Sequence, residues 1–179
     1  MISASVPRRA NAGRRIEDDS VSDFEPADEQ TFMLDLERFL ADRPERRENA
    51  LLWMEVEGLQ EAAQKDEIVS ESLAQQVIKL LSVRLEQGGP LARLGTQCFA
   101  VLIRSRPAVE ALQMARVLRT VMQNTGFYRR GDVVYLGIHI GLILFSRHCE
   151  KAELLDAAAA ACRFAKQEGF NRIHVLQLG

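Results

Sequence analysis

Apolar residues recur along this chain with two different periods, which predict helices and strands in alternation. Helical spacing occurs over residues 27–41, 68–85, 107–122 and 152–167, where apolar positions are three or four residues apart. Pro107 suits the first turn of the third helix, because its missing N–H needs no partner there. The predicted apolar faces are Phe32, Leu36, Phe39 and Leu40; Leu73, Val77, Leu80 and Leu81; Ala111, Ala115, Leu118 and Met122; and Leu154, Ala158, Ala161, Cys162 and Ala165.

Aliphatic runs over residues 50–56, 91–104, 133–144 and 172–177 predict strands. The second run has the form of strand, tight turn and strand, with Gly95-Thr96 at the bend. A short edge near residues 127–128 and a turn over 129–132 predict a hairpin-like pair with the third run. This order of elements predicts an α+β fold with a five- to six-stranded, mainly antiparallel central sheet flanked by helices.

Composition narrows the class of protein. The chain has 179 residues, is 47% hydrophobic and has a net charge of -2, which gives no reason to expect nucleic acid as a partner. No apolar run reaches the roughly 18 residues of a membrane span, so no membrane segment is expected. The three cysteines form no C-x-x-C pair and cannot all be in disulfides, which favours a reducing, cytoplasmic location.

The N-terminal residues differ in character from the rest. Residues 1–18 are polar, rich in arginine and without periodicity, so we predict a disordered tail followed by one domain over residues 19–179. Acidic residues follow the arginines at once, which favours a solvated tail over a binding arm.

Two carboxylates mark the end of the first strand. Glu55 and Glu57 are two residues apart and therefore share a face of the strand. They could hold a hard cation such as Mg²⁺ through oxygen ligands, or they could simply mark the exit of the strand into solvent.

The turn between residues 91 and 104 carries a family resemblance. The stretch R-L-G-T-Q-C-F-A-V-L resembles the R-x-G-G-D/E-E-F-x-x-L segment of GGDEF domains, the diguanylate cyclase family, without its acidic centre. Weaker likenesses lie at D-S-V-S-D-F, L-L-W-M-E-V-E-G-L-Q and L-G-I-H-I-G-L, and a more specific one at A-K-Q-E-G-F-N-R-I-H-V. The resemblance implies a degenerate signature turn consisting of Gly95, Thr96, Gln97, Cys98 and Phe99.

The resemblance also implies roles for residues outside the turn. It puts Glu55 at the position of a metal-binding Asp, Glu71 at that of a base-recognition Asp, and Lys166 at that of a basic residue that contacts the triphosphate. A base-reading Asn is replaced by Ala62 or Ala63, and a phosphate-binding Arg is replaced by Phe170. The R-x-x-D motif that binds the cyclic dinucleotide product is replaced at Glu86 and Gly89, so product inhibition is not expected.

These replacements imply a change of function. Two-metal phosphodiester chemistry needs carboxylates at the cations and groups that neutralise the triphosphate, and most of that set is missing. The resemblance implies a catalytically inactive regulatory or protein-interaction domain in cyclic-di-GMP signalling, as part of a GGDEF–EAL protein or with a separate protein partner. The alternative is a sensor that binds GTP without turning it over. No cofactor is expected, with Mg²⁺ only if nucleotide binds, and GTP binding should be weak or absent. His139, alone in an apolar strand, is expected to be a hydrogen-bonded core or edge residue.

Overall fold

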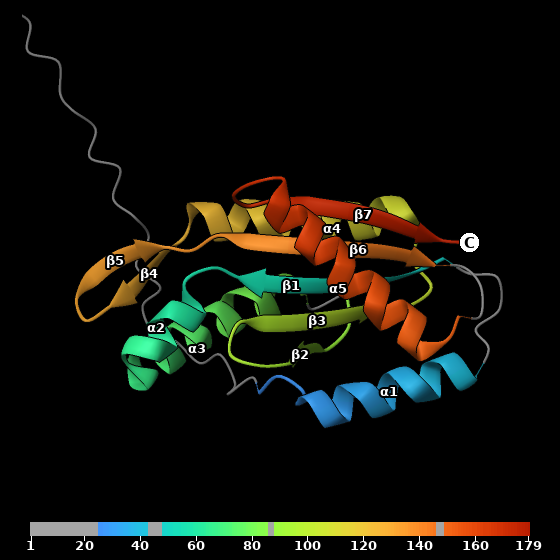
Figure 1. The fold of residues 1–179 in the computed structure, drawn as a ribbon, viewed down its shortest axis with the longest axis horizontal. Helices are drawn as coiled ribbons and strands as arrows, with labels where there is room; N and C mark the ends of the chain where they lie inside the picture. Colours follow the sequence, from blue (N-terminus) through green and yellow to red (C-terminus); the bar gives the residue numbers. More distant parts are fainter. Residues whose placement is uncertain (1–24, 43–47, 86–87, 146–148) are drawn as a thin grey trace, which may run out of the picture.

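The computed structural model describes residues 25–42, 48–85, 88–145 and 149–179, and they form one central sheet with helices on both faces (Figure 1). The elements are α1 (Glu29–Ala41), β1 (Asn49–Val56), α2 (Leu59–Lys65), α3 (Glu67–Leu85), β2 (Leu91–Arg93), β3 (Cys98–Ile103), α4 (Ala108–Asn124), β4 (Gly126–Arg129), β5 (Asp132–Tyr135), β6 (Ile138–Phe145), α5 (Lys151–Gln167) and β7 (Ile173–Leu178). The predicted tail, residues 1–18, and the D-S-V-S-D-F stretch lie outside the described residues.

The five-stranded sheet has the order β2-β3-β1-β6-β7, with β1 at its centre. Three of the four strand pairs are antiparallel, and only β7 runs parallel to its neighbour β6. The predicted mainly antiparallel sheet is therefore confirmed. A separate two-stranded sheet of β4 and β5 extends from one end of the molecule (Figure 1).

Alternation along the strands divides the core into two layers. Leu52, Met54 and Val56 of β1 pack with α3 and α4, whereas Leu51 packs on the opposite side with α1 and α5. The expected helix faces are buried, except that Phe39 and Leu80 are only partly covered. Within the described ranges, no helix is both long and apolar enough to cross a membrane.

Helix α5 lies unusually close to β6, as its alanine-rich face predicts. A methyl group placed on Gly141 would lie 2.6 Å from the backbone nitrogen of Cys162 and 2.7 Å from the carbonyl oxygen of Ala158. Backbone therefore meets backbone at this point, which only small side chains permit. This close contact fixes the last turn of α5, with Lys166, over the end of β1.

Two predicted elements need correction. The run over residues 133–144 is not one strand, because β5 ends at Tyr135 and β6 begins at Ile138 in a different sheet. The chain changes sheets at Gly137, where a side chain would collide with the ring of Phe170. Helix α2 was not predicted; it is separated from α3 by Asp66, whose extended backbone interrupts the helical pattern.

Candidate functional site

Part of the candidate site is a row of three side chains across the sheet, on the face that α5 covers. Glu55 of β1 is opposite Cys98 of β3 on one side and opposite His139 of β6 on the other. The end of β1 is further fixed by the amide of Val56, which donates to the carbonyl oxygen of Gln97 at 3.0 Å. The β2–β3 turn, the end of β1 and the start of β6 therefore meet at one edge of the domain.

Glu55 is paired with a lysine of α5. Nζ of Lys166 lies 2.5 Å from Oε2 of Glu55, and the Glu55 side chain is 19% exposed while that of Lys166 is 43% exposed. The hydrogen bond to Glu55 raises the pKa of Lys166, so the lysine is held as an ammonium ion. Glu55, the candidate metal ligand, is therefore already paired with a positively charged side chain of the same domain.

Glu57 is paired with His139 in the same row. The distance between Oε1 of Glu57 and Nε2 of His139 is 2.5 Å, and His139 is 1% exposed. The other ring nitrogen, Nδ1, is buried without a hydrogen-bond partner among the described residues. The expected role of His139 as a hydrogen-bonded core residue is confirmed, and Glu57 is its partner.

Glu71 lies beside the signature turn, although it comes from α3. Nη1 of Arg93 donates to Oε1 of Glu71 at 2.9 Å, and Nη2 of Arg93 is 2.9 Å from Oε2, so the pair is bidentate. Nε of Arg93 donates to the carbonyl oxygen of Gly95 at 3.0 Å. The bonds from Arg93 to the carboxylate, followed by one from Gln75, lower the pKa of Glu71. Arg93 thereby connects the carboxylate to the turn.

The turn itself presents a neutral thiol. Burial, followed by the negative charge of Glu55, raises the pKa of Cys98 to about 11. Its neighbour across the site, Cys162, donates its thiol to the carbonyl oxygen of His139 at 3.5 Å, and burial raises its pKa to about 12. Neither thiol ionises by itself near neutral pH, so neither adds a negative charge to the site.

The loop between α5 and β7 completes the site. Phe170 is 60% exposed, and its ring lies against Gly137, which the carboxylate of Glu57 also approaches. Asn171 is buried with φ of 58°, and its Oδ1 accepts from the amide of Ile138 at 3.1 Å while Nδ2 donates to Gln123 at 3.0 Å. Asn171 thus fixes the loop so that Phe170 covers the start of β6.

These residues do not fit Mg²⁺ as the sequence alone suggested. Mg²⁺ prefers near-octahedral oxygen ligands, which proteins usually supply as one or two carboxylates beside waters and substrate phosphates. Of the residues facing Glu55 here, Cys98 is neutral and Lys166 is positive. In the described part of the chain, no three His, Cys, Asp or Glu side chains are grouped so that they could hold a metal ion.

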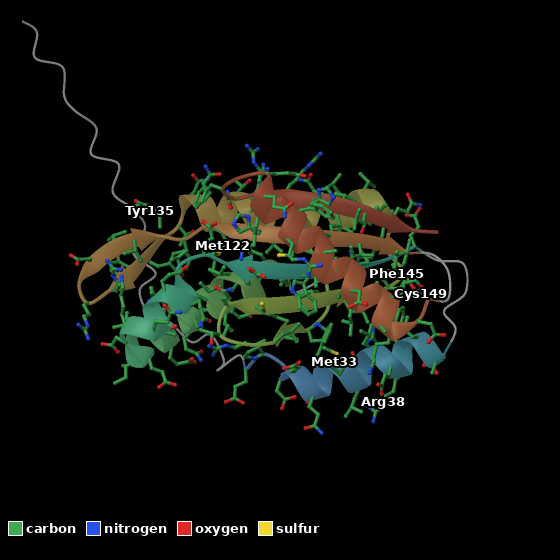
Figure 2. All side chains as sticks on the ribbon, viewed as in Figure 1. Met33, Arg38, Met122, Tyr135, Phe145 and Cys149 are labelled. Atoms are coloured by element: carbon green, nitrogen blue, oxygen red, sulfur yellow. The ribbon has the colours of Figure 1, made fainter. Side chains whose placement is uncertain are left out.

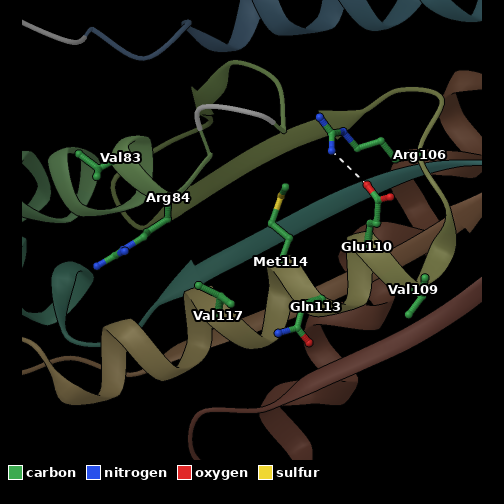
Figure 3. Close-up of a pocket in the computed structure, with 8 residues that line it drawn as sticks. All are labelled: Val83, Arg84, Arg106, Val109, Glu110, Gln113, Met114 and Val117. Carbon is green, nitrogen blue, oxygen red and sulfur yellow. Dashed lines mark hydrogen bonds and ion pairs between the residues drawn. The ribbon is translucent and has the colours of Figure 1, made fainter.

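A groove lies on the other side of the sheet, between α3 and α4 (Figure 3). It encloses about 530 Å³, and Arg106 crosses one end in an ion pair with Glu110 at 3.0 Å. The remaining lining residues are Val83, Arg84, Val109, Gln113, Met114 and Val117. None of its lining residues belongs to the signature turn.

The family resemblance groups Glu55, Glu71 and Lys166 with the turn. In the structure Glu55 is bonded to Lys166 and lies opposite Cys98, whereas Glu71 of α3 reaches the turn only through Arg93. Sequence reasoning missed Arg93, which was read only as part of a motif, and Asn171. The signal for Asn171 was its position after Gly169-Phe170, where a non-glycine residue with positive φ is most often Asn. Glu86 lies outside the described residues, while Gly89 lies against the carbonyl oxygen of Leu102, near the end of β3 that is away from the signature turn.

Comparison with known proteins identifies the family. Residues 67–172 match the family described as "Diguanylate cyclase, GGDEF domain". This match spans more than half of the chain, and the chain belongs to the GGDEF family. Among curated proteins, none is similar in sequence at a significant level.

Solved structures have the same fold. The GGDEF domain of PA1120 (YfiN or TpbB) from Pseudomonas aeruginosa has a TM-score of 0.76 at 23% identity, over 86% of this chain and 98% of that one. Diguanylate cyclase SiaD, in complex with its activator SiaC, from the same species has a TM-score of 0.77 at 12% identity, over 84% and 59%. An EAL/GGDEF domain protein from M. capsulatus has a TM-score of 0.66 at 19% identity, over 82% and 97%.

Proposed function

We propose that this chain is a catalytically inactive GGDEF domain that acts as a regulatory or protein-interaction module in cyclic-di-GMP signalling. One observation carries the proposal: three carboxylates at the candidate site are each paired with a basic side chain of the same domain. Glu55 is bonded to Lys166, Glu57 to His139 and Glu71 to Arg93. A carboxylate with a partner inside the fold must lose that partner before it can hold a metal or read a base, and breaking such a pair costs free energy.

The turn residues support the same conclusion. Gln97 is neutral, and Cys98 is held as a thiol by burial and by the charge of Glu55. Phe170 offers a ring where a phosphate would need a fork of donors. The site therefore lacks charged groups that phosphoryl transfer needs, both carboxylates to hold the cations and a guanidinium to neutralise the phosphate. Removing even one stabilising group typically costs about 10²-fold in rate.

The regulatory role requires a partner. We propose either an adjacent EAL-type domain, with this chain as part of a longer GGDEF–EAL protein, or a separate protein. One solved relative is an EAL/GGDEF domain protein and another is bound to an activator, so both arrangements occur among proteins of this fold.

The catalytic part of the proposal is tested by incubating the purified chain with GTP and Mg²⁺ or Mn²⁺ and separating the products by chromatography. We expect no cyclic-di-GMP above a heat-inactivated control. Product formation that disappears in Glu55→Ala would overturn the proposal, because it would show Glu55 at work in a functional metal site.

A GTP sensor is the second candidate, and the exposure of Lys166 favours it. This side chain is 43% exposed and could turn from Glu55 towards a phosphate. We nevertheless expect weak or absent binding, because one charge-assisted contact, at about 1.5–3 kcal/mol, and one neutral contact are missing. Calorimetry with GTP and Mg²⁺ decides the matter. A dissociation constant below about ten micromolar, lost in Lys166→Ala, would favour the sensor.

A further inference from the structure

The β4–β5 hairpin is held on the domain by contacts that leave one of its edges unused. Its two-residue turn, Arg130 and Gly131, has φ values of 50° and 93°. Positive φ at both positions is typical of tight hairpin turns, because the twist of such a turn matches the twist of the flanking strands. The guanidinium of Arg130 is bonded to Asp66 between α2 and α3. On the inner face, Phe127 is buried and Val134 packs against the main core. The hairpin is thus a fixed part of the fold.

The outer edge of β4 is already occupied. The side chain of Gln76 on α3 donates from Nε2 to the carbonyl oxygen of Tyr128 at 2.9 Å. Its Oε1 accepts from the amide of Tyr128 at 2.8 Å. A side-chain amide therefore forms the two hydrogen bonds that a neighbouring strand would form.

The same contact shows which groups of β5 point outward. Both backbone groups of Tyr128 point away from β5, so Tyr128 and its partner Val133 form a pair without mutual hydrogen bonds. Alternation then gives the same arrangement for Gly126 and Tyr135. The amides and carbonyls of Val133 and Tyr135 consequently lie on the outer edge of β5. In the described part of the chain, β5 has no strand neighbour except β4.

An apolar surface accompanies this edge. Tyr128, Val133 and Tyr135 lie on one face of the hairpin and are 53%, 50% and 68% exposed. Tyr135 lies at the end of the molecule from which the hairpin extends (Figure 2). The strand contains no proline or lysine, and its one charge, Asp132, is at the turn, so it lacks the usual protection of an exposed edge.

The other sheet edges are less suited to this purpose. The outer edge of β2 is bonded to Ala27, whose amide donates to Leu91 and whose carbonyl accepts from Arg93, both at 2.9 Å. The edge strand β7 is exposed at one large apolar side chain, Val175. Among the described strands, only the β4–β5 hairpin combines an open backbone edge, on β5, with three exposed apolar side chains.

We propose that the outer edge of β5 binds an extended peptide segment of a partner protein, which adds to the hairpin as a third strand. The backbone groups of Val133 and Tyr135 provide hydrogen bonds for the peptide. Apolar residues at alternate positions of the peptide continue the surface of Tyr128, Val133 and Tyr135. This inference rests on the interaction role proposed above and assigns a surface to it.

A second copy of the chain is a poorer occupant of this edge. Pairing of β5 with β5 of another copy would involve two short strands of four residues each. Stable protein interfaces bury about 800 Å² on each partner, far more than such a contact supplies. A short peptide, by contrast, can place most of its own surface in the contact.

The probe is a displayed library of random octapeptides, selected on the whole 179-residue chain and followed by resynthesis of the enriched sequences. We expect sequences with alternating apolar residues, and peptide-induced NMR shift changes centred on the amides of Val133 and Tyr135.

Val133→Pro removes an outward amide of β5 without removing a hydrogen bond to β4, so peptide affinity should fall about tenfold or more. Because that variant could disturb the hairpin, Tyr135→Lys is measured beside it, and a peptide N-methylated on its pairing edge should also bind about tenfold more weakly.

The control variant is Val109→Lys, which changes an exposed apolar residue in the α3–α4 groove and should leave peptide affinity unchanged. Enrichment of no alternating sequence, binding insensitive to Tyr135→Lys, or loss of binding in Val109→Lys would each overturn the proposal. Dimerisation through β5 without peptide binding would do so too. The proposed lack of catalysis is decided separately by the GTP assay, so either idea can fail alone.

Discussion

Nζ of Lys166 and Oε2 of Glu55 are 2.5 Å apart, joining the last turn of α5 to the central strand of the sheet. This ion pair sits at the edge where the family resemblance places a metal. The position of Lys166 follows from the close contact of α5 with Gly141. This contact is made at Cys162, four residues before Lys166 on the same helix. The packing of the helix therefore determines the electrostatics of the site.

The ion pair should make a small, pH-dependent contribution to stability. Because Glu55 raises the pKa of Lys166 above its usual 10.5, this contribution is present below that pH and is lost as the pH rises through the higher folded-state value. Lys166 is substantially exposed, so Lys166→Met should cost only about 0.5 kcal/mol at neutral pH. Thermal unfolding at neutral and strongly alkaline pH measures the difference.

The control for that measurement is Lys79→Met, which changes an exposed lysine of α3. It should show no comparable change between neutral and alkaline pH. A Lys166→Met variant whose deficit grows at alkaline pH would contradict the predicted sign of the pKa shift.

Gly141→Ala should destabilise the domain by about 1–3 kcal/mol or more, because its methyl group would meet backbone atoms of Cys162 and Ala158 that cannot rotate away. The measurement is chemical denaturation followed by circular dichroism. Gly179→Ala, with nothing within 4 Å of the new methyl group, is the matched control and should be neutral. A neutral Gly141→Ala would mean that α5 is further from β6 than described here.

The helices and main strands could be predicted because their apolar residues recur with the period of the element that buries them. The apolar run over residues 133–144 predicts one strand because such a run does not reveal that the chain changes sheets at Gly137. The ring that lies beside Gly137 belongs to Phe170, more than 30 residues away in sequence, so this contact is not visible in the local pattern.

The candidate site could also be predicted only in part. The family resemblance assigns Glu55, Glu71 and Lys166 to one site because the matching motif positions belong to one site in that family. Their partners could not be predicted, since the pairing of Glu57 with His139 depends on the β1–β6 register. The bond of Arg93 to Glu71 likewise depends on how α3 crosses β2.

Arg93→Met should loosen the signature turn with little effect on global stability. Arg93 holds the carbonyl oxygen of Gly95 and both oxygens of Glu71, so its loss frees the turn from α3. We expect faster amide hydrogen exchange at residues 95–97 and a loss of about 1 kcal/mol or less, because Glu71 is half exposed. The control is Arg84→Met, which changes an arginine of α3 that lines the groove and lies away from the turn. Unchanged exchange at the turn would contradict the proposed role of Arg93.

Cys98 should be unreactive towards alkylating reagents at neutral pH, although it lies in the turn that the family uses for chemistry. Burial and the charge of Glu55 raise its pKa to about 11, so only about one molecule in 10³ carries the thiolate at pH 8. The measurement is iodoacetamide labelling with peptide mass spectrometry, for native and unfolded protein. We expect slow labelling of native Cys98 and fast labelling after unfolding.

The same shift has a consequence for stability, with a definite sign. An unfolded thiol ionises near pH 9.0, whereas folded Cys98 and Cys162 ionise near 11 and 12, so the fold favours the neutral thiols and loses stability as the pH rises above 9. Cys98→Ser removes one titrating group, so its stability should fall less steeply as the pH rises above 9.

Glu55→Gln removes the negative charge that helps to raise the pKa of Cys98, so labelling of Cys98 should become faster at a given pH. Rapid labelling of native Cys98 at neutral pH, unaltered by Glu55→Gln, would show that the turn holds a thiolate and would contradict its assignment as a neutral site.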